Sequence, residues 1–263
     1  MDIHVGIDVG GTFTDVAVNV PSANHFIHFK LPSTPGEPDR AIIEGVAQAI
    51  SENNLNPQDI ARLSHGTTVG TNALLTGKGA HVGLFVTEGF GGINDVWHLA
   101  PSEDTSKVTS PYVEKKPPVL PRFRREAKER VNYKGEITKS LDESAVIEAV
   151  KSLGKRGIQS IAVVLLFSFL NDKHEKRIEE IIKQELPEAT VSLSSSVLPQ
   201  MREFPRLSTT VANAYIAPMM VTYLEALERR IREHMVTSDA LYVMQSNGGV
   251  ARIASVTPVT TVL

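Results

Sequence analysis

The sequence contains no cysteine among its 263 residues. This absence excludes disulfide bonds, thiolate metal ligands and a cysteine nucleophile, and it is typical of proteins that work in a reducing compartment. The first residues also lack the basic and apolar stretches of a secretory leader. We therefore expect a cytoplasmic protein.

Long apolar runs and a strong charge of either sign are also missing. No run approaches the roughly 20 residues of a membrane-spanning helix. The net charge of −3 gives no reason to expect a nucleic-acid or anionic-membrane partner. With 41% hydrophobic and 22% charged residues, the composition is that of a globular protein with a sizeable core.

Several familiar motifs of catalysis are absent as well. There is no Gly-Lys-Ser/Thr after a glycine-rich loop, and no Gly-x-Gly-x-x-Gly. His174-Glu175 lacks a second histidine four residues after the first, which excludes a zinc-protease helix, and we interpret the pair as a solvated helix N-terminus. The eight histidines are otherwise unclustered, so no histidine metal site is expected.

The most informative stretch that is present is Val5–Val18. An apolar strand runs into Asp8, then into Gly10-Gly11, and a second β-rich run follows. The spacing predicts a strand–turn–strand in which the two glycines supply the positive φ of a tight hairpin.

The side chains around this turn favour phosphate binding. Thr12 and Thr14 are expected on one face at the strand period of two, bracketed by Asp8 and Asp15. Glycine amides and threonine hydroxyls can hold phosphate oxygens, and a neighbouring carboxylate can hold hydrated Mg²⁺. The alternative is an ordinary hairpin with solvated side chains, because turns favour these residues in any case.

The order of elements predicts a layered α/β fold. An opening three-stranded meander, with strands near 3–9, 12–20 and 25–31, is followed by alternating helices and strands. The very apolar segment Ile158–Phe169 is expected to be a central parallel strand. A long helix is expected over 208–234, bent or broken at Pro218. We divide the chain into a first α/β part (1–95), a loop and hairpin excursion (96–141) and a second α/β part (142–263).

Polar clusters follow three predicted strands, where ligand-binding loops lie in α/β folds. The first cluster is His65-Gly-Thr67-Thr68 with Asn72, in which the threonines are more often helix caps than ligands. The second, Thr87-Glu88-Gly89, equally fits a simple turn. The third is Gln245-Ser246-Asn247-Gly248-Gly249, where paired glycines permit close approach to a ligand. Arg206, before the long helix, is a candidate clamp for a carboxylate or phosphate, with a surface ion pair as the more frequent alternative.

Nine motifs together resemble the hydantoinase A/5-oxoprolinase family, in order along essentially the whole chain. They are Asp8-Val-Gly-Gly-Thr-Phe-Thr-Asp15, His65-Gly-Thr-Thr-Val, Asn72-Ala-Leu, Thr87-Glu-Gly-Phe90, Glu129-Arg-Val, Ser194-Ser-Ser-Val197, Ser208-Thr-Thr-Val, Asn213-Ala-Tyr and Met244-Gln-Ser-Asn-Gly-Gly249. The family belongs to the actin-like/sugar-kinase ATPase superfamily, and Asp8–Asp15 resembles its first phosphate loop. The resemblance therefore implies the N-terminal portion of an actin-like ATPase fold.

The resemblance also implies a function and a set of site residues. It implies ATP- and Mg²⁺-dependent opening of a cyclic amide, such as a hydantoin or 5-oxoproline, through phosphorylation of the carbonyl oxygen, with a B-type subunit or domain as partner and a possible homo-oligomer. Asp8 would position the metal, and Gly10, Gly11, Thr12, Thr14 and Asp15 would hold the nucleotide. The substrate would be faced by His65, Thr67, Thr68, Asn72, Arg206, Ser246, Asn247 and Gly248.

Two departures from the family pattern bear on these expectations. The family often has Glu-Tyr-Glu-Arg where this chain has Glu203-Phe-Pro-Arg206, and family members are far longer. The apolar, β-prone stretch Thr257–Leu263 has no polar tail, so we expect a fragment that ends before the second half of the ATP cleft. Besides the cyclic-amide hydrolase, a ketone carboxylase subunit and an inactive scaffold or partner-binding fragment remain open.

Overall fold

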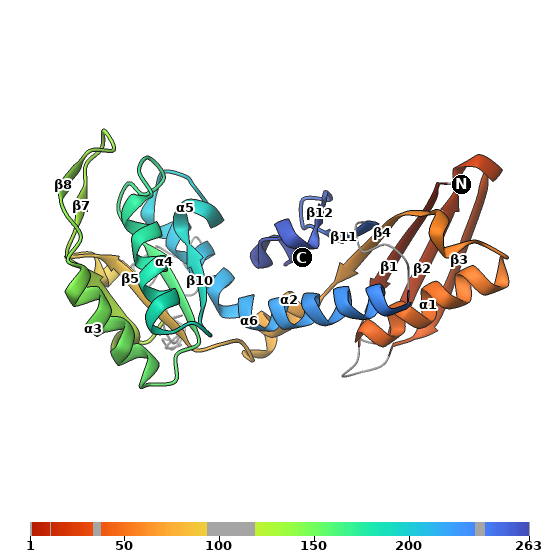
Figure 1. The fold of residues 1–263 in the computed structure, drawn as a ribbon, viewed down its shortest axis with the longest axis horizontal. Helices are drawn as coiled ribbons and strands as arrows, with labels where there is room; N and C mark the ends of the chain where they lie inside the picture. Colours follow the sequence, from red (N-terminus) through yellow and green to blue (C-terminus); the bar gives the residue numbers. More distant parts are fainter. Residues whose placement is uncertain (1, 11, 34–37, 94–118, 235–239, 263) are drawn as a thin grey trace, which may run out of the picture. The chain divides into compact units, whose positions relative to one another are not determined.

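The computed structural model describes residues 2–10, 12–33, 38–93, 119–234 and 240–262 (Figure 1). These residues form two compact units. Unit 1 comprises Met1–Lys78 together with Met219–Leu263, and unit 2 comprises Gly79–Pro218. The two units do not follow the boundaries at residues 95 and 141 that the sequence suggests, because the last part of the chain returns to the first sheet.

Unit 1 is built on a six-stranded mixed sheet of order β12-β11-β4-β1-β2-β3. Its strands are β1 (Ile3–Val9), β2 (Phe13–Val20), β3 (His25–Pro32), β4 (Ile60–Thr67), β11 (Leu241–Met244) and β12 (Val250–Arg252). The antiparallel pairs β1–β2 and β2–β3 confirm the predicted meander. Strands β1, β4 and β11 run parallel, and β12 folds back against β11.

One face of this sheet carries the core of unit 1. In β1 every second residue is buried, as expected for a strand with one covered face. Helix α1 (Pro38–Glu52) packs on that face through Ile42, Val46 and Ala49, which recur at helical spacing (Figure 1). Leu227 and Ile231 of helix α6 (Glu203–His234) join the same core.

The remaining elements of unit 1 are short. They are η1 (Pro21–Ala23), η2 (Pro57–Asp59), α2 (Val69–Thr76), η7 (Ile253–Ser255) and η8 (Pro258–Thr261). Helix α2 follows β4 directly and ends at Gly77, whose φ of 68° is the left-handed conformation that glycine tolerates best. Helix α2 packs against η8, which therefore lies beside the end of β4.

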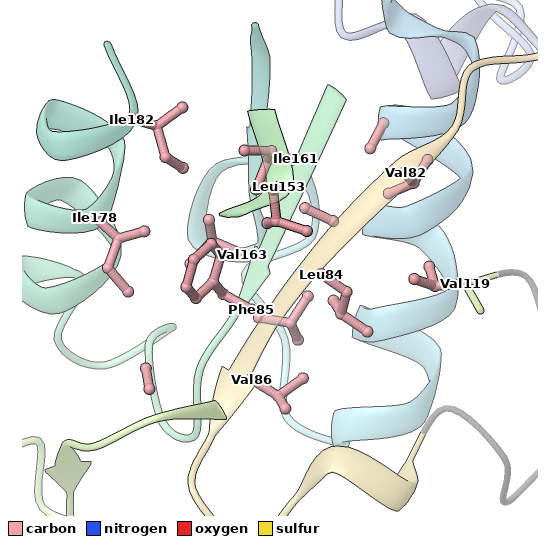
Figure 2. Packing of buried hydrophobic residues seen from close by; sticks show 14 of the residues in the cluster. Val82, Leu84, Phe85, Val86, Val119, Leu153, Ile161, Val163, Ile178 and Ile182 are labelled. Carbon is pink, nitrogen blue, oxygen red and sulfur yellow. The ribbon is translucent and has the colours of Figure 1, made fainter. Parts of the chain in front are cut away.

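Unit 2 contains a four-stranded parallel sheet of order β10-β9-β5-β6. Its strands are β5 (Val82–Thr87), β6 (Arg124–Ala127), β9 (Ser160–Val164) and β10 (Thr190–Leu193). Helices α3 (Glu143–Gly154), α4 (Lys173–Glu185) and α5 (Ser194–Val197) accompany it, with the turn η5 (Pro121–Phe123) before β6. Figure 2 shows Val82, Leu84 and Phe85 of β5 meeting Leu153 of α3 and Ile178 of α4 in the core.

The predicted central strand is confirmed but is shorter than expected. All five residues of β9 are buried between β5 and β10. The strand ends at Val164 because the next two amides have side-chain partners: Leu165 N donates to Glu175 Oε1 and Leu166 N to Thr87 Oγ1, both over 2.9 Å. The chain then turns through Phe167, which has a φ of 53°.

The predicted hairpin after residue 128 is also confirmed. Strands β7 (Arg130–Val131) and β8 (Ile137–Lys139) pair antiparallel around Gly135, which has a φ of 79°. Strand β6 is an element that the sequence pattern did not predict. The rest of the predicted excursion, residues 94–118, lies outside the described residues.

Helix α6 begins at Glu203 and continues through Pro218. Of the two predicted effects of this proline, a break is therefore wrong, and a bend stays a prediction. A proline inside a helix costs about 3 kcal/mol. Buried side chains on both sides of it, Val211 and Ala214 before and Leu224 and Leu227 after, provide compensating burial. Among the described residues, no helix is long and apolar enough to cross a membrane.

Candidate functional site

The carboxyl ends of three parallel strands of unit 1 lie level with one another. In the sheet register Asp8 of β1 lies beside Gly66 of β4, and Val243 of β11 lies beside His65. The turns that follow these strands therefore emerge at one edge. This edge is the candidate site, and it brings together all the predicted site residues that the structure describes except Arg206.

Asp8 is exposed at this edge. A Cβ atom at position 66 would lie 3.0 Å from Asp8 Oδ1, so glycine at this position leaves room for the carboxylate over the backbone of β4. Among the described residues the carboxylate has no hydrogen-bond or ion-pair partner. Such an open carboxylate fits Mg²⁺, which takes one or two carboxylates and completes its shell with water and phosphate oxygens.

The turn after β1 is tight because of a close backbone approach. Gly10 N donates to Phe13 O over 3.0 Å, and a Cβ atom on Gly10 would lie only 2.9 Å from that oxygen. Gly10 does not adopt a positive φ, so the predicted reason for this glycine is wrong: it is required by space. Gly11 lies outside the described residues.

Ser33, which follows β3, holds this turn in place through hydrogen bonds. Its Oγ donates to Gly10 O over 2.8 Å and lies 3.0 Å from Thr14 Oγ1, while its backbone amide donates to Thr12 O. Thr14 is 0% exposed, whereas Thr12 is exposed. The prediction that the two hydroxyls share one outward face is therefore wrong, because Thr14 follows the inward alternation of β2 and Thr12 precedes the strand.

Asp15 lies opposite Asp8 in the sheet. Like charges at opposed positions repel each other. The ammonium group of Lys30 lies 3.0 Å from Asp15 Oδ1 and His28 Nε2 lies 3.2 Å from the same atom. Lys30, with a smaller contribution from His28, lowers the pKa of Asp15 below its ordinary value. Asp15 is thus engaged on the open face of the sheet, and Asp8 is the free carboxylate of the pair.

His65 is fully buried, which contradicts the prediction that it faces a substrate. Its Nε2 lies 2.5 Å from the hydroxyl of Tyr223, on helix α6. Burial lowers the pKa of His65 to about 4, and an interaction with the Ile7 backbone opposes that shift. The ring is therefore neutral near pH 7, and it lies on the core side of the sheet because it is in register with Ile7.

The other residues after β4 mostly support the start of α2. Thr67 is 3% exposed and its Oγ1 accepts a hydrogen bond from Val69 N. Thr68 precedes the helix, and its Oγ1 accepts from Asn72 Nδ2 over 3.3 Å. Thr68 stands at the predicted N-cap position but makes no side-chain hydrogen bond to the helix backbone, whereas Thr67 does bind a backbone amide of α2. Thr68 and the exposed Asn72 remain near the edge.

The turn between β11 and β12 completes the edge. Gly248 has a φ of 82°, and Asn247 Oδ1 accepts from Gly249 N over 2.8 Å. Ser246 N donates to Thr260 O of η8, which holds the turn next to α2. Ser246, Asn247 and Gly248 are exposed. Their polar groups therefore face outward at the same edge as Asp8.

Arg206 lies elsewhere, in unit 2, and is only 1% exposed. Its guanidinium donates to Ser168 Oγ over 3.0 Å and to Leu165 O over 2.7 Å, and it packs on the ring of Phe169. Burial lowers the pKa of Arg206, while the nearby carboxylate of Glu175 acts in the opposite direction. The predicted role as an open clamp does not fit this position: Arg206 fixes the chain after β9.

A second buried group surrounds Arg206 at the carboxyl ends of the unit 2 strands. Glu175 accepts from Leu165 N, Ser194 Oγ and Ser195 N, so both its oxygens are bonded. Next to it in the chain, His174 Nδ1 lies 2.7 Å from Glu129 Oε2, and Thr87 donates to the other oxygen of Glu129. The interpretation of His174-Glu175 as solvated is therefore wrong, because both side chains are buried.

Sequence reasoning missed Ser33, Tyr223, Glu129 and Glu175 as structural partners of the site and of unit 2. Glu129 and Ser194 belong to the motifs of the family resemblance, but the sequence does not indicate that they bind His174 and Glu175, respectively. Ser33 and Tyr223 carry no local signal, since each acts on a strand far away in the sequence. Among the described residues no group of three potential metal ligands gathers.

Comparisons with known proteins agree with this architecture. Residues 4–186 match the hydantoinase/oxoprolinase N-terminal region, and residues 206–263 match the hydantoinase/oxoprolinase family. Caprolactamase subunit alpha of Pseudomonas jessenii is 34% identical over 94% of this chain and 36% of its own length. The acetophenone carboxylase gamma subunit of Aromatoleum aromaticum is 33% identical (93% and 35%), and 5-oxoprolinase 1 of Arabidopsis thaliana is 31% identical (93% and 21%).

Solved structures confirm the predicted α/β, actin-like fold. The ATP-dependent caprolactamase of P. jessenii superimposes with a TM-score of 0.79 at 32% identity, over 95% of this chain and 36% of that one. A nucleotide-free acetone carboxylase gives 0.84 at 22% identity over 98% and 39%, which supports the fold alone. The chain thus spans little more than a third of the length of these proteins.

Proposed function

Because this chain belongs to the hydantoinase/oxoprolinase family, we propose that it supplies the first phosphate-binding part of an ATP-dependent enzyme that opens a cyclic amide. The observation that carries the proposal is the edge of unit 1, where the exposed Asp8 lies beside Gly66 and among three polar turns. An edge of this kind, at the ends of parallel strands, is where α/β folds bind ligands.

The roles of the residues follow from their positions. Asp8 would hold Mg²⁺ through its open carboxylate, and the turn at Gly10, with the exposed Thr12, would lie against the phosphates. Bound Mg²⁺ supplies charge neutralisation on the phosphates during transfer. Ser33 and Thr14 would keep the turn in shape from the core side.

The polar turn Gln245–Gly249 offers the best substrate contacts within unit 1. Ser246 and Asn247 expose a hydroxyl and an amide, groups that can donate to and accept from an amide substrate. An amide carbonyl carbon reacts poorly with water. Transfer of the γ-phosphoryl group to the carbonyl oxygen activates the carbon towards water. Water adds to that carbon, the ring C–N bond breaks as the nitrogen takes up a proton, and hydrolysis of the remaining acyl phosphate gives a carboxylate and inorganic phosphate. A hydantoin or a 5-oxoproline-like lactam is the substrate class proposed.

A ketone carboxylase subunit is the second candidate. It is supported by the 33% identity to the acetophenone carboxylase gamma subunit, and an enol oxygen can be phosphorylated by the same logic. Both this relative and caprolactamase alpha are subunits by name, which supports a B-type subunit as the partner. The third possibility is a scaffold or partner-binding role without turnover.

The test is ATP hydrolysis by the full-length protein together with the subunit encoded next to it. Hydantoin, 5-oxoproline, simple lactams and aryl ketones with bicarbonate are compared, with Mg²⁺ present or chelated. Lactam-dependent, Mg²⁺-dependent turnover that Asp8→Ala abolishes supports the proposal. Stimulation by ketone and bicarbonate alone moves the protein to the carboxylases, and silence with every compound in a folded complex favours the scaffold.

A further inference from the structure

The hydrogen bond between Tyr223 and His65 connects helix α6 with the strand next to Asp8. Both residues belong to unit 1. The hydroxyl lies 2.5 Å from His65 Nε2, and the two rings lie 5.7 Å apart between centroids, tilted by 55°. The imidazole is 0% exposed, so water does not compete for this bond.

His65 also lies next to strand β1. It is the register partner of Ile7, and the interaction of the ring with the Ile7 backbone raises its pKa. Among the described residues His65 Nδ1 has no hydrogen-bond partner.

A neutral imidazole has one donor nitrogen and one acceptor nitrogen. The Tyr223 hydroxyl lies at Nε2 and can take either role, so it holds this nitrogen in both tautomers. The contacts thus run from helix α6, through the ring, to strand β1 at Ile7, the residue before Asp8.

We propose that Tyr223 is a positioning residue, which holds the His65 ring so that the Ile7–Asp8 peptide and the neighbouring Gly66 keep Asp8 in place for phosphoryl transfer. The inference rests on the proposed function of Asp8 and adds to it a residue that touches neither nucleotide nor substrate. Its hydroxyl orders the site from behind, through the core side of the sheet.

Kinetics of the full-length protein with its neighbouring subunit give the first test. Tyr223→Phe removes only the hydroxyl, and we expect kcat for ATP hydrolysis to fall about tenfold, the size of effect seen when a supporting hydrogen bond is lost. KM for ATP changes little. Tyr215→Phe is the matched control: it lies on the same helix, in unit 2, its hydroxyl has no partner among the described residues, and it should leave kcat unchanged.

The double variant His65→Leu/Tyr223→Phe separates positioning from simple packing. Replacing both hydrogen-bond partners by apolar groups leaves no buried polar group unsatisfied, so stability returns close to that of the wild type. If Tyr223 positions Asp8, kcat stays low in this stable variant. Recovery of kcat together with stability would overturn the inference.

Amide hydrogen exchange gives a readout that does not need activity. In Tyr223→Phe we expect exchange to speed up about tenfold at Asp8–Gly10 and Gly66–Thr68, while helix α1 is unchanged. Unchanged exchange at these amides, or global unfolding of the variant, would overturn the inference. If the wild-type complex hydrolyses no ATP, the proposed function fails and the exchange experiment alone decides about Tyr223.

Discussion

The two units differ in how the polar residues at the carboxyl ends of their parallel strands are bonded. In each, parallel strands end in polar side chains at the carboxyl edge of a sheet. In unit 1 Asp8, Ser246 and Asn247 are exposed at this edge, and Asp8 has no partner among the described residues. In unit 2 Glu129, Glu175 and Arg206 are buried, with partners on nearly every polar atom. A polar residue at a strand end is thus a candidate ligand only where its bonding capacity is unused.

Replacing a carboxylate by an amide tests this difference between the two edges. The larger loss of stability is expected in unit 2. Glu175→Gln puts an NH₂ group where backbone and serine donors point, and it removes one of the two carboxylates, Glu175 and Glu203, that favour the charged form of Arg206. We expect a loss of about 3 kcal/mol in the free energy of unfolding, because buried donors lose their acceptor. Urea denaturation followed by circular dichroism measures it.

The control for this variant is Glu148→Gln, on the exposed side of α3. It makes the same chemical change in solvent, where we expect an effect within about 0.5 kcal/mol. A loss of the same size in both variants would show that the buried network is no more important than a surface carboxylate.

The corresponding change in unit 1 should act on turnover alone. Asp8→Asn keeps the shape of an exposed side chain and removes its charge, so we expect ATP hydrolysis to fall by about 100-fold or more. The free energy of unfolding should stay within about 0.5 kcal/mol of the wild type. Steady-state kinetics and urea denaturation of the same preparation test both halves, and a stability loss with turnover intact would reverse the comparison.

His65 combines features of both units. It lies near the carboxyl end of β4, as the candidate site does, but its side chain is buried in the core like the polar residues of unit 2. Its pKa is about 4 in the folded chain and about 6.5 unfolded. The unfolded chain therefore takes up the proton first as the pH falls. The contribution of the neutral ring is complete above pH 6.5 and is lost down to pH 4, by up to about 3 kcal/mol.

His65→Leu should flatten this part of the stability curve. Unfolding free energies measured at intervals between pH 7 and pH 4 should fall more steeply for the wild type than for the variant. Parallel curves for the two proteins would mean that the ring titrates alike in both states, and would contradict the burial of His65.

The smallest effect is expected on the open face of the unit 1 sheet. Lys30→Ala removes the closest cation from Asp15. Exposed ion pairs contribute little, so we expect only a slight loss of stability, which 1 M salt removes. Differential scanning calorimetry at low and high salt measures it. A large, salt-independent loss would place Asp15 among the structurally essential carboxylates.

The fold was predictable where one side-chain pattern dominates. The meander, the hairpin at Gly135 and the buried strand β9 follow from local alternation and apolar runs. The end of β9 was not predictable, because Glu175 and Thr87 take over its next amides from distant elements. Strand β6 was missed, since a segment as polar as Arg124–Ala127 does not show the pattern of a strand.

The sequence motifs identified most residues of the candidate site, but they did not show which of these side chains are exposed. Register alone brings Asp8, Gly66 and the turn after β11 together, as expected for ends of parallel strands. Which side chains are free was not readable from the sequence. Thr14, His65 and Arg206 carry the right chemistry for ligands, but each is buried by neighbours that are remote in the chain.

The discontinuity of unit 1 also has a consequence for how the protein is made. Strand β4 lies next to β11, which is synthesised only after all of unit 2. While the ribosome is still translating, β4 exposes an unpaired edge, and unit 2, whose residues are contiguous, is complete first. Until β11 is made, this edge of the sheet stays open, and an open strand edge is a template on which another chain can pair.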